Sequence, residues 1–181
     1  MRTISVLLAA VLATALAGGC EAGSAEDSPP AAAGRSATPA YGPAVVHLDG
    51  VRGLRFGATE ADLTARGVVV RDVPGCGPRA VDTPGATPVF VAGTLALVWA
   101  DQPLRTPDGV SAGDPVAKVR AAHPNAVELR APRGSYRFDG LLAPTGDRAY
   151  LFLHDGRAVR KLIVGYADAA RALFNEGFSG C

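Results

Sequence analysis

Three kinds of residue in this sequence could take part in chemistry: histidines, cysteines, and a serine close to an aspartate. The histidines are His47, His123 and His154, and none stands in the HxxxH or HExxH spacing that places two ring nitrogens on one metal ion. A lone histidine followed by proline, as at His123, more often marks the end of a helix. The histidines therefore predict no metal site.

A hydrolase could in principle be assembled from Ser111, Asp114 and His123. Ser111, however, lies in no GxSxG motif, the turn that exposes the nucleophile of many serine hydrolases. The segment from Gly53 to Gly57 likewise lacks the GxxxxGK pattern of a phosphate-binding loop. We therefore expect no enzyme, no catalytic residue and no cofactor, and a hydrolase stays as an alternative.

The first of the three cysteines, Cys20, follows a segment with the features of an export signal. Residues 1–19 contain one positive charge, an apolar run over residues 4–17 and small residues before the cysteine. This ending resembles a bacterial lipobox, where the signal peptide is cut before a cysteine that carries the lipid. The resemblance implies lipidation of Cys20. Ordinary cleavage after Ala17, and hence plain secretion, is the alternative.

The segment that follows, residues 20–43, predicts a disordered tether. It is rich in Ala, Gly, Ser and Pro and has no apolar periodicity, so it cannot bury enough surface to fold. As a flexible coil it would hold a domain on the order of 25–30 Å from its attachment point. We therefore expect a protein of the cell membrane, lipid-anchored through Cys20 on the extracytoplasmic face, with its folded domain at residues 44–181.

Cys76 and Cys181 remain once Cys20 is assigned to the lipid, and we expect them to form a disulfide. Export places both in an oxidising compartment, and neither has the CxxC neighbour or nearby histidine that a redox or metal site requires. A bridge between them would stabilise the domain by about 4–5 kcal/mol in the chain-entropy model. It would also attach the carboxyl terminus to the first half of the domain.

A repeated phrase organises this domain. Aligning Gly57 with Gly113 places Leu54 on Val110 and Leu63 on Val119, so one unit is used twice. Each phrase predicts a short helix. Thr59 should cap the first, which should end at Gly67, whereas Asp114 should cap the second, with Pro115 at its first position and a stop at His123-Pro124.

The remaining pattern predicts strands and one further helix. A tight hairpin is expected through Ala92-Gly93-Thr94, and a second around Asp155-Gly156, since this dipeptide is a strong turn signal. A final helix is expected over residues 168–175, with Asp168 as its cap and Gly177 as its stop. The expected strands are Val45–Leu48, Val68–Val70, Val89–Val91, Leu95–Trp99, Val127–Leu129, Ser135–Phe138, Tyr150–Leu153 and Val159–Tyr166.

Together these elements predict an α+β domain, because antiparallel hairpins with short helices leave no long crossover for a parallel sheet. Two tandem repeats of a short helix plus antiparallel strands, at about 50–105 and 106–166, should form a sheet with helices on one face. The C-terminal helix and tail would occupy residues 167–181.

The repeated phrase resembles that of small actinobacterial secreted proteins and lipoproteins, most of which are uncharacterised. It stands here as Gly53–Thr59 and Gly109–Pro115, and the closing FNEGFSGC is also similar. More distantly, the helix-plus-sheet repeat is similar to β-lactamase inhibitory proteins and to outer-membrane assembly lipoproteins of the SmpA/OmlA type. Both groups bind proteins, so the resemblance implies a binding domain. A secreted inhibitor of the β-lactamase-inhibitor type is the alternative.

The charge balance bears on the partner. Arg2 is the one basic residue before Cys20, so 17 basic residues balance 17 acidic ones in the mature chain. This balance argues against a nucleic-acid partner, which requires a basic surface. We expect the partners to be the membrane, through the lipid on Cys20, and an envelope protein or wall component.

Overall fold

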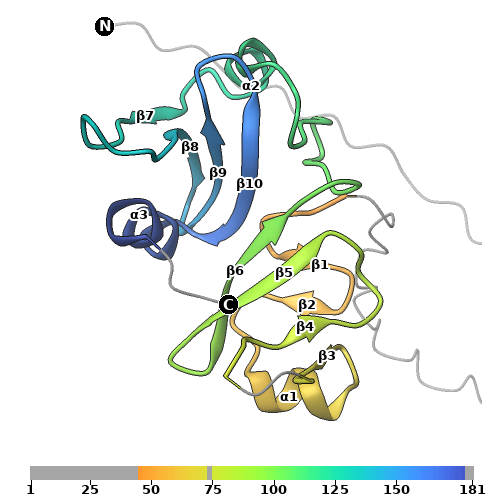
Figure 1. Cartoon of the computed structure of the whole chain (residues 1–181). Coiled ribbons are helices and arrows are strands. Elements are labelled where there is room, and N and C mark those ends of the chain that lie inside the picture. Colours follow the sequence, from red (N-terminus) through yellow and green to blue (C-terminus); the bar gives the residue numbers. More distant parts are fainter. Residues whose placement is uncertain (1–44, 73–74, 178–181) are drawn as a thin grey trace, which may run out of the picture. The chain divides into compact units, whose positions relative to one another are not determined.

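Six antiparallel strands form the main sheet of the computed structural model, which describes residues 45–72 and 75–177 (Figure 1). They lie in the order β5-β6-β10-β9-β8-β7. Their bounds are β5 Ala86–Val91, β6 Thr94–Ala100, β7 Val127–Leu129, β8 Asp139–Thr145, β9 Arg148–His154 and β10 Val159–Tyr166. Two further pairs are β1 Gly50–Val51 with β2 Leu54–Arg55, and β3 Val69–Val70 with β4 Arg79–Ala80.

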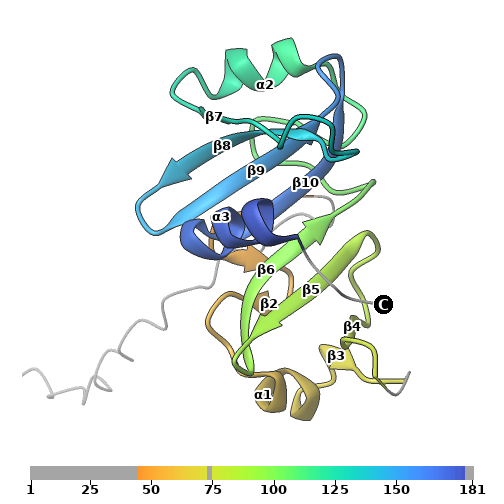
Figure 2. The same cartoon turned by 60° about the vertical axis from the view of Figure 1, so that its left-hand side comes forward.

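Three helices complete the described residues, namely α1 Glu60–Ala65, α2 Val116–Ala122 and α3 Ala167–Glu176. Figure 1 shows α1 beside the β3–β4 pair and α2 beside the turn between β9 and β10, and Figure 2 shows α3 lying across the strands. The mixture of helices with antiparallel strands confirms the predicted α+β class. Within the described residues, no helix is long and apolar enough to cross a membrane.

The sheet separates two hydrophobic clusters. One contains Leu63 of α1 and Val119 of α2, packed with strand residues such as Phe152 and Leu162. The other contains Leu173 and Phe174 of α3 and strand residues such as Leu151 and Ile163. Adjacent strand residues belong to different clusters because side chains alternate between the two faces of a strand. The helices α1 and α2 therefore share one cluster, and α3 packs into the other.

Two turns make the same backbone contacts with two different hairpins. Gly57 N–H donates to the Leu95 carbonyl at 3.0 Å, and Leu95 N–H donates back to the carbonyl after Gly57, that of Ala58, at 2.9 Å. Gly113 N–H donates to the Val159 carbonyl at 2.8 Å, and Val159 N–H donates back to Asp114 at 2.9 Å. Both glycines have positive φ angles, 88° and 96°, which a residue with a Cβ adopts only at a cost.

Both hairpins were predicted, and turn chemistry explains them. In the β5–β6 hairpin Ala92 and Gly93 both have positive φ, as a two-residue turn of the favoured twist requires. In the β9–β10 hairpin the Asp155 carboxylate accepts the N–H groups of Arg157 and Ala158, each at 2.9 Å. These hydrogen bonds hold the pKa of Asp155 far below its usual range, so the carboxylate is charged and fixes the turn.

The helix ends were predicted in part. Thr59 caps α1 by accepting the N–H of Asp62 at 3.1 Å, and the predicted ends at Gly67, His123 and Gly177 are confirmed. Asp114, by contrast, does not cap α2. Its N-cap is Pro115 without a side-chain bond, and the Val116 N–H instead donates to the Arg157 carbonyl at 3.0 Å.

The assignment of Asp168 as a cap was also wrong. Strand β10 runs directly into α3, whose N-cap is Tyr166, and the Ala167 N–H donates to the Asp147 carbonyl at 2.9 Å. Because tertiary contacts satisfy this donor, no capping side chain is needed, and Asp168 is simply an acidic residue of the first turn.

Two strand predictions were wrong, and strands β1, β2, β4 and β8 were not predicted. Val45–Leu48 makes only isolated bridges, from Val45 to Arg105 and from His47 to Gly50, and forms no strand. Ser135–Phe138 is an exposed loop. Strand β8 was not predicted, because Gly140 and Pro144 interrupt its pattern. Pro144 is tolerated since β7 pairs only with residues 140–142, which leaves Pro144 beyond the end of that ladder.

Candidate functional site

The three residues considered for a hydrolase are not brought together. The Asp114 carboxylate accepts the Ser111 N–H at 2.7 Å, lies 3.2 Å from the Ser111 hydroxyl, and pairs with Lys118 at 2.9 Å. Partial burial raises the pKa of Asp114, but the hydrogen bonds from Lys118 and Ser111 outweigh it and hold that pKa below its ordinary value. In the described part of the chain, the hydrogen bonds of Ser111 and Asp114 do not include His123. This cluster fixes the turn before α2.

His123 ends α2 and lies over two aromatic rings of β9. Its ring centroid is 5.8 Å from that of Tyr150 and 5.3 Å from that of Phe152, and its Nε2 lies 3.8 Å from the nearest Asp108 carboxylate oxygen. His123, Asp108 and Tyr150 are among the residues that line a cavity of about 380 Å³. Packing against the aromatic rings accounts for the position of His123, and the arrangement brings it no serine.

The other histidines lie apart from His123 in the fold. His47 lines a neighbouring open cavity of about 510 Å³. His154 is buried, with 3% of its surface exposed, and its Nδ1 accepts the Gly156 N–H at 3.1 Å. Burial lowers the pKa of His154, because the charged ring loses its hydration. Among the described residues, no group of three or more His, Cys, Asp or Glu side chains is placed to hold a metal ion.

Two of the three cysteines, Cys20 and Cys181, lie outside the described residues. Cys76 is disulfide-bonded, and its carbonyl accepts a hydrogen bond from Arg71 at 2.5 Å. Arg71 also pairs with Glu60 of α1 at 2.6 Å, which ties this loop to the helix. The pairing of Cys76 with Cys181 and the lipid on Cys20 stay predictions.

A third cavity lies on the face of the sheet that carries α3. It has a volume of about 200 Å³ and is lined by Trp99 of β6, Leu153 of β9, Leu173, Phe174 and Gly177 at the end of α3, and Arg137 and Phe138 of the β7–β8 loop. Most of these side chains are apolar, and they come from three separate parts of the fold. This apolar pocket is the feature that sequence reasoning missed.

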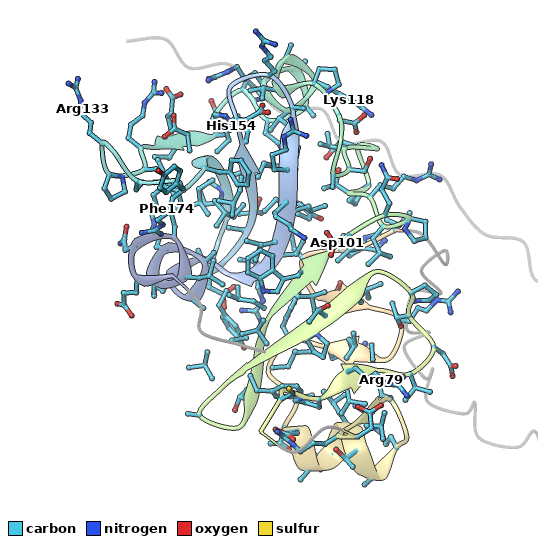
Figure 3. All side chains as sticks on the ribbon, viewed as in Figure 1. Arg79, Asp101, Lys118, Arg133, His154 and Phe174 are labelled. Carbon is cyan, nitrogen blue, oxygen red and sulfur yellow. The ribbon has the colours of Figure 1, made fainter. Side chains whose placement is uncertain are left out.

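The β7–β8 loop, residues 130–138, forms one rim of the apolar pocket. Tyr136 is fully exposed, with a relative exposure of 105%, and Phe138 is 40% exposed. Figure 3 shows Arg133 extending away from the ribbon at the tip of this loop, while Phe174 lies on the side of α3 next to it. The loop therefore presents two aromatic side chains and two arginines beside an apolar hollow.

The base of this loop is held firmly. Asp139 accepts the Ala131 N–H at 2.9 Å and pairs with Arg130 at 3.0 Å, and Arg130 also pairs with Glu128 of β7. The hydrogen bond from Ala131 is the main cause that lowers the pKa of Asp139, so this carboxylate is charged at neutral pH. The loop thus starts and ends at fixed points, although the residues from Pro132 to Phe138 are exposed.

The sequence held a signal for this surface. Pro132-Arg133-Gly134 predicts a turn, and Ser135–Phe138 predicts a strand, for whose aromatic side chains core packing is the favoured explanation and a partner-binding face the alternative. The structure places Tyr136 and Phe138 outside the core instead. Comparison with protein-family models, with curated proteins and with solved structures gives no match. The arrangement of these side chains is consequently the basis for inferring a function.

Proposed function

We propose that this protein is a membrane-tethered cell-envelope lipoprotein whose domain binds another protein and catalyses no reaction. The observation that carries the proposal is the exposed Tyr136 and Phe138 beside the apolar pocket. Exposed tyrosine, phenylalanine and arginine are enriched at the centres of protein interfaces, where they supply large contact areas at a low cost in side-chain entropy. Scattered exposed apolar residues are normal, but aromatic residues gathered around a hollow favour a partner.

The tether part of the proposal rests on the sequence. The export signal, the lipobox-like ending at Cys20 and the low-complexity segment to residue 43 are its support. A lipid anchor would keep the domain near the membrane, where an envelope partner is available. Cys20→Ala should release the protein from the membrane fraction. Retention of that variant at the membrane after signal cleavage would contradict the anchor.

We also propose that the domain consists of two copies of one unit, each with a helix, a short strand, a loop and a hairpin. The matched hydrogen bonds of Gly57 and Gly113 support this equivalence. So do the bridges that follow them, Thr59 to Thr94 and Pro115 to Ala158. In both hairpins the strand register also shifts close to the turn, between Val89 and Phe90 in the first hairpin and between Val159 and Lys161 in the second.

Site-specific photo-crosslinking tests the binding function. A photoreactive phenylalanine analogue replaces Tyr136 in the full-length protein, produced in its own cells. We expect a crosslinked protein adduct at this position and none when the same analogue replaces Arg66, an exposed residue at the end of α1. Equal adducts at both positions, or adducts at neither, would contradict a specific protein-binding surface at the β7–β8 loop.

A further inference from the structure

We infer that the apolar pocket and the β7–β8 loop take an extended acidic segment of the partner, with one large apolar side chain seated in the pocket and a carboxylate on the arginines. This inference rests on the proposed function and adds the chemistry of the partner segment. Three observations carry it: the size and walls of the pocket, the uncompensated positive charge on its rim, and the shape of the loop above it.

The pocket fits one large apolar side chain. Its volume of about 200 Å³ far exceeds the roughly 10–15 Å³ that one water needs, so it has room for several waters. Trp99, Leu153 and Phe174 give such waters few hydrogen-bond partners. An apolar side chain that displaces poorly bonded water gains affinity, whereas a polar one would leave its own groups unpaired. The walls therefore select an apolar anchor.

The positive charge on the rim of the apolar pocket determines which kind of partner residue lies next to the apolar side chain. Arg137 stacks over the Phe174 ring at 5.6 Å and donates one hydrogen bond, to the Asn175 carbonyl at 3.0 Å. A guanidinium carries five N–H donors in a planar fork, so further donors of Arg137 can reach a ligand. Arg133 makes no ion pair or hydrogen bond within the described residues.

Most nearby carboxylates are already neutralised by other groups. Asp139 and Glu128 both pair with Arg130, and Asp101 pairs with Lys161 at 3.1 Å. Glu176, the last residue of α3, adjoins Asn175, whose carbonyl accepts from Arg137, so it is one acid beside the two arginines of the rim. The rim thus keeps a net positive charge, which matches an acidic partner, because arginine binds carboxylates in a two-pronged geometry.

The loop favours a peptide over a flat lipid surface. A membrane would contact the tip at Tyr136 and Arg133 but could not fill a hollow bounded by the sheet and α3. An extended chain, in contrast, can pass under the loop and place a single side chain into the pocket, as peptides do in other grooves. The occupant is therefore a peptide segment.

A peptide selection tests this inference with the mature chain carrying Cys20→Ala, which keeps Cys76 and Cys181. A phage-displayed library of random dodecapeptides is selected on this protein, with counter-selection on a Leu153→Gln variant. We expect enriched peptides with Leu, Ile, Phe or Met next to Asp or Glu. A selection that enriches nothing above the counter-selected background, or that enriches basic or purely polar peptides, overturns the inference.

Affinity measurements with an enriched synthetic peptide sharpen the test. Combined Arg133→Glu and Arg137→Glu should weaken binding by about tenfold or more, because the new acids repel the peptide carboxylates. Arg171→Glu is the matched control. Arg171 is exposed on the same α3 and does not line the pocket, so its reversal should change affinity by less than about twofold. Equal weakening by both changes overturns the assignment of the rim.

Two further experiments distinguish a peptide from other possible occupants of the pocket. If Phe178→Ala raises peptide affinity by more than about tenfold, the tail of the chain fills the pocket and the inference is overturned. If phosphatidylglycerol vesicles bind the protein through Tyr136 and Phe138 and compete with the peptide, the surface belongs to lipid. A Tyr136 crosslink to a basic segment of a partner would overturn this inference while leaving protein binding intact. The absence of any crosslink would reject the proposed function itself.

Discussion

In the two-unit arrangement that we propose, the loop between β3 and β4 corresponds to the loop between β7 and β8, and the two loops are held in different ways. The first is held by contacts at several of its described residues. Cys76 is disulfide-bonded, Arg71 binds both Glu60 and the Cys76 carbonyl, and Arg79 pairs with Asp72 at 2.6 Å. The second is held at its base, where Arg130 and Asp139 pair, and by Arg137, which donates to the Asn175 carbonyl of α3 at 3.0 Å.

This difference teaches where function can reside in a domain made of similar units. A loop crossed by a disulfide and by a side-chain clamp loses conformational freedom, and its residues serve stability. The β7–β8 loop, which no disulfide among the described residues crosses, presents side chains to solvent, and Tyr136 is fully exposed in it. The first half therefore supplies the anchored loop and the second half the presented one.

The largest expected effect comes from breaking the joint between the halves. Strands β6 and β10 pair there, and Gly165 lies opposite Leu97 with φ at +148°. A Cβ on Gly165 would lie 2.1 Å from the Ala96 carbonyl oxygen, so the strands would have to separate. We expect Gly165→Ala to cost about 3 kcal/mol or more of unfolding free energy, measured by urea denaturation.

Gly156→Ala is the matched control for that change. Gly156 also has a positive φ, +89°, but a Cβ there meets no atom within 4 Å. Gly156→Ala should therefore lower the unfolding free energy by only about 1 kcal/mol, because it adds backbone strain but no steric clash. Similar losses for both variants would contradict the close approach of β6 and β10.

The second-largest effect concerns the disulfide of Cys76, which holds the β3–β4 loop. Cys76→Ser should lower the unfolding free energy by about 2–5 kcal/mol, since the unfolded chain regains the freedom that the disulfide removed. If Cys181 is the partner, Cys181→Ser should cost the same and the double variant no more, because both changes break one bond. Additive losses, or two titratable thiols in the unfolded, unreduced protein lacking Cys20, would contradict this pairing.

Much of the fold could be predicted from local signals. The hairpins at Ala92-Gly93 and Asp155-Gly156, the Thr59 cap and the Gly177 stop depend on residues close in sequence, so turn and capping chemistry identifies them. Strand β8 could not be recognised, because its place beside the short edge strand β7 makes Pro144 acceptable. That circumstance exists only in the assembled sheet.

The candidate site was less predictable than the fold. The apolar pocket joins residues from β6, β9, α3 and the β7–β8 loop, which periodicity within one segment cannot bring together. Alternation in Tyr136-Arg137-Phe138 indicated a strand, yet exposure depends on whether a neighbouring strand is there to pair with it. Asp114 failed as a predicted cap for a similar reason, since Lys118 and Ser111 hold its carboxylate.

A smaller effect concerns the pH dependence of stability, in which we expect the two hairpins to differ. His154 pairs with Val159 where Phe90 pairs with Leu95 in the other hairpin. Burial lowers the folded-state pKa of His154, although Asp139 and Glu128 raise it and Arg120 and Arg130 lower it further. The unfolded chain therefore binds a proton first, so stability should be fully present above about pH 6.5 and should decline as pH falls below that value.

Replacing the histidine with its counterpart tests this origin. His154→Phe should flatten the loss of stability between neutral pH and pH 5, measured by urea unfolding at each pH. An unchanged slope in His154→Phe would show that other groups cause the acid sensitivity.

The smallest effect on stability should come from the loop that we assign to binding. Tyr136→Ala removes a side chain that is fully exposed, so the unfolding free energy should change by less than about 0.5 kcal/mol. Tyr150→Phe provides the contrast within one residue type. The Tyr150 hydroxyl donates to the Val46 carbonyl at 3.2 Å in a buried position, and its loss should cost about 1 kcal/mol.

Binding of the selected peptide should respond in the opposite order, falling strongly with Tyr136→Ala and little with Tyr150→Phe. If Tyr136→Ala destabilised the fold as much as Tyr150→Phe, the β7–β8 loop would belong to the core, and the distinction between an anchored loop and a presented loop would fail.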